Sequence, residues 1–203
     1  KYGFFKTEMD TFLKIAKELE LRKVNDNPVE YARHPLVYLV EAADDICYEI
    51  MDIEDAHKLK ILDTQKTFEL FLGFFDPIRD KSFFKKKEVV FQEVGDINEQ
   101  VAYLRASVIN KLIKELADVF LLHHDEILDG KYDSSLVKDL HETSKNAFNR
   151  CKKLAIREIY NHPSVVKIEL AGYNVLGTLL DEFISALNKP TSDYSRKILS
   201  IIP

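Results

Sequence analysis

The chain has 203 residues, enough for one medium-sized domain that buries about 70% of its unfolded surface. Its net charge of −5 lacks the basic surplus of a dedicated nucleic-acid-binding protein, so nucleic acid is not expected as the main partner. No apolar run approaches the length of a membrane span, so no membrane association is expected. Cys47 and Cys151 are too few for a disulfide framework. Both are expected to be reduced core residues of a cytoplasmic protein.

Helical patterns cover most of the chain. Six Gly and six Pro leave few turn signals, and the alternation typical of strands is scarce. The predicted helices are Thr7 to Leu21 with a Thr cap, Pro35 through the acidic stretch, Lys58 to Phe75, Asp96 to His123, Leu136 to Tyr160 in one or two pieces, Pro163 to Leu187, and Ser192 onward. Lys81 to Gly95 is the least clear segment, and Asn25 to Tyr31 is predicted to be a polar break. The predicted fold class is all-α, with residues 1–203 as a single helical segment.

The stretch from Glu41 to Asp55 is the most informative part of the sequence. At about 100° per residue it divides into two faces. The predicted apolar arc contains Leu36, Leu39, Ala43, Ile46, Cys47, Ile50 and Ile53, and the opposing stripe contains Glu41, Asp44, Tyr48, Asp52 and Asp55. Carboxylates on one helix face repel one another unless a cation or a ligand offsets their charge. The stripe is therefore interpreted as part of a ligand site, and a solvated acidic surface is the alternative.

Several segments carry a family resemblance. Residues 34–48, which read HPLVYLVEAADDICY, and residues 51–55, which read MDIED, closely resemble the dGTP triphosphohydrolase family of HD-domain phosphohydrolases. Residues 2–8, 103–110 and 168–176 are similar to other segments of that family, in the same order. The resemblance implies an HD-domain-like multi-helix bundle from the C-terminal part of a longer, homo-oligomeric protein. The bundle would be incomplete, without the N-terminal helices of the metal site and the C-terminal tail.

The resemblance also implies site residues. In this family a divalent metal is held by a His, a His-Asp pair and a final Asp, with a Tyr four residues later and an Asp eight residues later on the sugar. Counted from Asp44, these steps reach Tyr48 and Asp52; counted from Asp45, they reach a Glu and an Ile, which fit neither role. Asp44 is thus the expected ligand of Mg²⁺ or Mn²⁺, both of which accept carboxylate oxygen. Tyr48 is expected to pack on the deoxyribose and Asp52 to accept a hydrogen bond from its 3′-hydroxyl.

Two weaker assignments concern the base. Glu169 corresponds to a family position that can accept hydrogen bonds from guanine, and Tyr160 could stack on the base. An interhelical ion pair and a half-buried core aromatic remain the respective alternatives. The His124-Asp125 dipeptide spells the HD motif but follows Asp44 instead of preceding it, so a solvated helix end is predicted there.

These features predict part of a metal-dependent enzyme that converts dGTP and water to deoxyguanosine and triphosphate. The metal would lower the pKa of a bound water and offset charge on the α-phosphate. Because only one metal ligand is identified, the chain alone is expected to be inactive. The alternatives are another HD-domain phosphohydrolase, and a non-catalytic helical module for oligomerisation or nucleotide binding.

Overall fold

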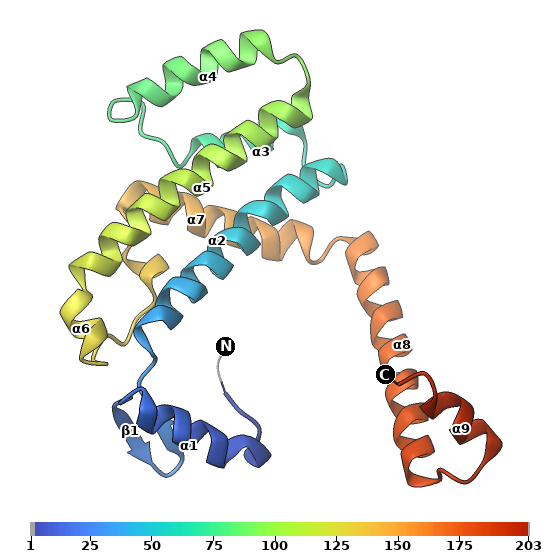
Figure 1. The fold of residues 1–203 in the computed structure, drawn as a ribbon. Helices are drawn as coiled ribbons and strands as arrows, with labels where there is room; N and C mark the ends of the chain where they lie inside the picture. The colour runs from blue at the N-terminus through green and yellow to red at the C-terminus, as the bar shows by residue number, and fades with distance from the viewer. Residues whose placement is uncertain (1–2, 203) are drawn as a thin grey trace. The chain divides into compact units, whose positions relative to one another are not determined.

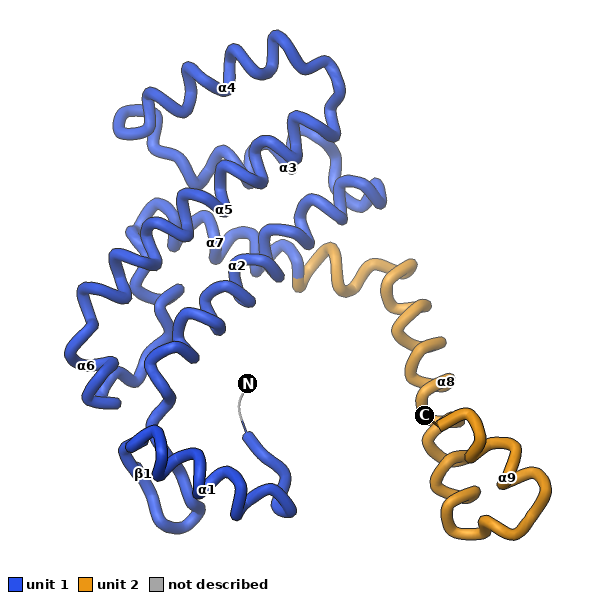
Figure 2. The backbone as a smooth tube through the Cα atoms, in the orientation of Figure 1, with its two compact units in different colours: residues 1–155 blue, residues 156–203 orange. Residues whose placement is uncertain are grey.

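The structure, a computed structural model, describes residues 3–202. Tyr2, the first residue of one family-like segment, lies outside the described residues. The chain divides into two compact units, residues 1–155 and 156–203 (Figure 2). The helices of the first unit are α1 (Met9–Glu18), α2 (Pro35–Lys58), α3 (Thr64–Leu72), α4 (Lys81–Glu93), α5 (Ile97–Leu122), α6 (His124–Leu128) and α7 (Glu142–Leu154), with 3₁₀ turns η1 (Lys6–Glu8) and η2 (Leu136–Asp139). A π-helical turn, η3 (Ala155–Ile159), precedes α8 (Pro163–Asn188) and α9 (Asp193–Leu199).

The all-α prediction is confirmed, apart from one small hairpin. Strands β1 (Lys23–Asp26) and β2 (Val29–Tyr31) pair antiparallel with Asp26 opposite Val29, where the sequence predicted a polar break. Two intervening residues suffice to turn an antiparallel pair. The predicted Thr7 cap is also wrong, because a 3₁₀ turn occupies Lys6–Glu8 and α1 begins at Met9.

The core of the first unit forms where α2 and α5 pack together. Figure 1 shows α5 running alongside α2, with α7 crossing α2. The apolar residues that recur at helical spacing on α5 are all buried: Val101, Leu104, Val108, Leu112, Leu116 and Val119. Ile50 and Ile53 of α2 are fully buried, and an aliphatic side chain of this size contributes about 1.5–3 kcal/mol when it leaves water. The α2–α5 pair therefore supplies much of the apolar burial that stabilises the unit.

The segment of least clear pattern is the helix α4. No residue of α4 is buried, which explains its weak periodicity in the sequence. Aromatic rings hold it instead: Phe83 stacks on Phe75 with ring centroids 3.6 Å apart, and Phe91 lies 5.3 Å from Phe68. Ring pairs at such distances contribute about 0.5–1.5 kcal/mol beyond area burial.

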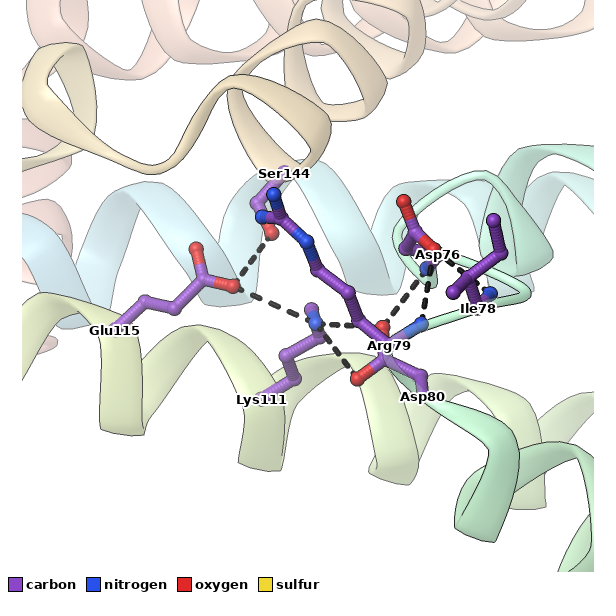
Figure 3. Close-up of polar contacts among 7 residues, drawn as sticks. All are labelled: Asp76, Ile78, Arg79, Asp80, Lys111, Glu115 and Ser144. Carbon is purple, nitrogen blue, oxygen red and sulfur yellow. Dashed lines mark hydrogen bonds and ion pairs between the residues drawn. The ribbon is translucent and has the colours of Figure 1, made fainter.

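A polar network fixes α5 to the α3–α4 loop and to α7 (Figure 3). The Lys111 ammonium donates to both carboxylate oxygens of Asp80, at 2.9 and 3.2 Å, and lies 3.6 Å from Glu115 Oε1. Ser144 Oγ on α7 donates to the same Glu115 oxygen at 2.8 Å. Within the α3–α4 loop, the backbone N–H of Asp76 donates to Asp80 Oδ2 at 2.8 Å. One ammonium thus serves two carboxylates from different elements.

The second unit consists mainly of α8, against which α9 packs. Ala186 and Ser195 are buried there, whereas apolar side chains such as Ile168 and Tyr173 are 74% and 80% exposed. Among the described residues, no helix combines the length and apolarity that crossing a membrane requires.

Candidate functional site

The acidic stripe lies on α2, whose start is defined by its sequence. His34 caps the helix by accepting a hydrogen bond from the Leu36 N–H at its Nδ1, 3.2 Å away, and Pro35 occupies the first turn as predicted. Pro suits this position because the first helical N–H groups have no partner within the helix. The helix then runs without interruption to Lys58, so the whole stripe shares one rigid element.

The side of α2 that packs into the core differs from the predicted apolar arc. Ile46, Ile50 and Ile53 are buried as predicted. The other predicted arc members, Leu36, Leu39, Ala43 and Cys47, are exposed. The core instead takes in the neighbouring side, which adds Tyr38, Ala42, Glu49, Glu54 and Ala56. The arc was wide enough to supply two faces, and periodicity did not show which of them would be covered.

The two cysteines therefore differ in their exposure to solvent. Cys47 is exposed, which corrects the prediction that both are core residues. Cys151 on α7 is fully buried, and this burial raises the pKa of its thiol to about 12. A thiol in that state is inert, because the thiolate is the reactive form.

The end residues of the stripe have structural ion-pair partners. Glu41 pairs with Arg33 at 2.8 Å, and the same guanidinium donates to the Ser134 carbonyl at 2.8 Å. Asp55 lies 3.5 Å from Lys58 in an exposed pair, which contributes little. Glu41 and Asp55 are thus engaged at the two ends of the stripe, and the residues with predicted ligand roles lie between them.

The three predicted α2 site residues share one side of the helix. Asp44 and Tyr48 are exposed, with Tyr48 at 58%, and Asp52 is half-buried. Eight residues of helix separate Asp44 from Asp52 by about 12 Å along the axis. This spacing suits contacts to two separate parts of one ligand, with the Tyr48 ring between them.

The described residues do not complete a metal site. No group of three or more His, Cys, Asp and Glu in this part of the chain could hold a metal ion, and the role of Asp44 as a metal ligand remains a prediction. The His124-Asp125 dipeptide, which spells the HD motif, follows the end of α5 at Leu122, as predicted, but it also begins the short helix α6, which the sequence did not predict. The His123 ring lies 3.1 Å from Glu126, and the His124 ring lies 2.9 Å from Asp125.

The two predicted base contacts belong to the second unit, whereas the α2 residues belong to the first. Tyr160 is half-buried just after η3, and Glu169 is exposed on α8. Both remain predictions as base contacts.

Arg105 on α5 is engaged in an ion pair with α2: its Nε donates to the buried Glu54 carboxylate at 2.9 Å.

A pocket beside the stripe was not predicted from the sequence. A hollow of about 230 Å³ lies among α2, η2 and α7. Its lining residues are Asp45, Tyr48, Glu49, Ser135, Val137, Lys138, Lys145, Phe148, Asn149 and Lys152. The α7 residues Lys145, Asn149 and Lys152 recur at helical spacing, a pattern that marks one helix face. The spacing of these three residues is visible in the sequence, but the sequence does not show that they face α2.

Comparisons with known proteins identify relatives that match 92–98% of the chain. No family model matches it. A deoxyguanosinetriphosphate triphosphohydrolase-like protein of Synechocystis sp. (strain ATCC 27184 / PCC 6803 / Kazusa) is 36% identical over 187 residues, which cover 92% of this chain and 40% of the relative. A deoxyguanosinetriphosphate triphosphohydrolase of Yersinia pestis (strain Pestoides F) is 27% identical over 206 residues, covering 98% and 39%, respectively. A triphosphohydrolase-like protein of Pseudomonas aeruginosa (strain LESB58) is 30% identical over 190 residues, covering 92% and 40%.

The chain is thus an all-helical segment homologous to nucleotide hydrolases. It belongs to the deoxyguanosinetriphosphate triphosphohydrolase family, and the resemblance found in the sequence is confirmed. It spans about 40% of the length of the curated relatives it matches.

Proposed function

We propose that the full-length protein containing this chain is a metal-dependent triphosphohydrolase that converts dGTP to deoxyguanosine and triphosphate. The observation that carries the proposal is the arrangement on α2, where Asp44, Tyr48 and Asp52 share a side of the helix between two ion-paired carboxylates. Homology to relatives named as dGTP triphosphohydrolases supports the substrate class.

Each α2 residue has a proposed task. Asp44 supplies one ligand of a divalent metal, Mg²⁺ or Mn²⁺, and the remaining ligands come from outside these 203 residues. Tyr48 packs on the deoxyribose, where a 2′-hydroxyl would clash with the ring. Asp52 accepts a hydrogen bond from the 3′-hydroxyl, and an unpaired acceptor there would disfavour substrates that lack this group. Glu169 and Tyr160 contact the guanine base.

The test is hydrolysis of dGTP by the full-length protein, followed as release of triphosphate. Asp44→Asn should abolish turnover, because the amide is a weaker, uncharged metal ligand. Asp55→Asn, a change of the same kind on the same helix, should leave turnover within about twofold, because an exposed pair contributes little. Full turnover by Asp44→Asn would refute the assignment. The 203-residue chain alone should release no triphosphate.

We further propose that the full-length protein is a homo-oligomer. The apolar side chains exposed on α8, which include Ile168 at 74%, Tyr173 at 80% and Leu176 at 63%, support this proposal, because large exposed apolar patches mark interaction surfaces. Light scattering should give a mass of several chains for the full-length protein. A monomer at micromolar concentration would contradict the proposal.

A further inference from the structure

One residue that lines the pocket among α2, η2 and α7 is Glu49, which has a buried acceptor atom without a donor in the described part of the chain. Glu49 is 7% exposed, and among the described residues no hydrogen-bond donor reaches its Oε2 atom. Burial raises the pKa of this carboxyl group, the charge of Lys152 opposes that shift, and the charges of Asp52 and Asp45 add to it. A buried acceptor without a donor loses its hydrogen bonds to water and gains none in return, which is unfavourable. The Glu49 oxygen therefore points to a ligand that brings a donor.

The rest of the lining favours an anion. Lys145 and Lys152 lie two turns apart on α7, and Lys138 approaches from η2. The three ammonium groups outnumber the two lining carboxylates, those of Asp45 and Glu49, so a metal cation would meet net repulsion. The ligand that fits both features is an oxyanion that also carries an O–H group.

Inorganic hydrogen phosphate has this chemistry at neutral pH. Its charged oxygens accept hydrogen bonds from ammonium groups, and its P–OH can donate to a carboxylate. Sulfate offers a similar charge and shape but has no proton to donate. A phosphate monoester, with a second pKa near 6, has lost most of that proton at pH 7. The pocket is also larger than a single water, whose share of liquid volume is about 30 Å³.

We propose that this pocket is a binding site for inorganic hydrogen phosphate. Lys138, Lys145 and Lys152 contact the charged oxygens, and Glu49 Oε2 accepts the P–OH. The site is separate from the proposed metal ligand Asp44 and does not depend on dGTP hydrolysis. Since Tyr48 also lines the pocket, bound phosphate lies beside the proposed sugar contact.

The test is calorimetric titration of the full-length protein at pH 7 and constant ionic strength, with EDTA present to remove metal-dependent phosphate binding. Sodium phosphate, sodium sulfate and glycerol 3-phosphate are compared. Phosphate should bind at least about tenfold more tightly than either competitor, the factor expected for one hydrogen bond to a charged group. Equal affinity for phosphate and sulfate, or no saturable phosphate binding, would overturn the proposal.

Variants test the lysines and the Glu49 carboxylate separately. Lys145→Met combined with Lys152→Met should weaken phosphate binding by about tenfold or more, whereas Lys153→Met, on the same helix but outside the lining, should not. Glu49→Gln should reduce the phosphate preference over sulfate to about threefold or less, and Glu142→Gln is its matched control. Wild-type binding by the double lysine variant would refute the site. If Glu49→Gln does not fold, as judged by thermal melting, the anion comparison and the lysine variants decide the question.

Discussion

Replacing Lys111 with Met should destabilise the first unit, because one ammonium neutralises two carboxylates in the network of Figure 3. The Lys111, Asp80 and Glu115 side chains are 21%, 24% and 11% exposed, so water can only partly replace the lost contacts. Removing one partner of a buried pair costs about 3–5 kcal/mol. The partial exposure of this pair reduces the expected loss to about 2 kcal/mol.

Urea unfolding of the chain, followed by circular dichroism, measures this loss. Urea is preferred to guanidinium because it is uncharged and does not screen the ion pairs under study. Lys114→Met is the matched control, since Lys114 is exposed one turn further along α5 and should change the unfolding free energy by no more than about 0.5 kcal/mol. If both variants lose the same free energy of unfolding, the ion pairs of Lys111 do not stabilise the unit.

Three further predictions follow from α2 and α7. In the full-length protein, Asp52→Ala should reduce the preference for dGTP over its 3′-deoxy analogue by about ten- to hundred-fold; an unchanged ratio of kcat/KM values would remove Asp52 from the site. A thiol reagent at pH 8 should label Cys47 rapidly and Cys151 only after denaturation, because burial raises the pKa of Cys151 to about 12; equal labelling rates in the folded chain would contradict this. Ile53→Ala, at a fully buried site, should lower the unfolding free energy by about 2–5 kcal/mol, whereas Leu36→Ala, 60% exposed, should change it by about 0.5 kcal/mol or less. Urea unfolding compares Ile53→Ala with Leu36→Ala, and equal losses of unfolding free energy would show that the assigned buried face of α2 is wrong.

The sequence predicted the helices well where one face was uniformly apolar. On α5, the apolar residues that recur at helical spacing from Val101 to Val119 are all buried, since a narrow stripe permits one packing orientation. The hairpin at Lys23–Tyr31 was missed, because short strands between turn residues give no periodic signal. The pocket beside the candidate site is lined by two of the helices, α2 and α7, and by the η2 turn.

The α2 helix shows why the site was only partly predictable. Its apolar residues span an arc wide enough for two faces, and sequence periodicity cannot show which face a partner element covers. Burial of Glu54 depends on Arg105, 51 positions away, and the charge of Lys152 reaches Glu49 from α7. A sequence pattern on one helix contains no information on such distant partners, so the pocket beside Tyr48 could not be predicted.

Two of the ion pairs of α2, both with arginines outside the helix, also set the rotation of the helix about its own axis. Arg33 holds Glu41 near one end, and Arg105 holds Glu54 near the other. A slip of one residue would turn every side chain by about 100° and would break both pairs together. The directions in which Asp44, Tyr48 and Asp52 point therefore depend on contacts made toward the two ends of the helix, so exchanging either arginine should misalign these three residues.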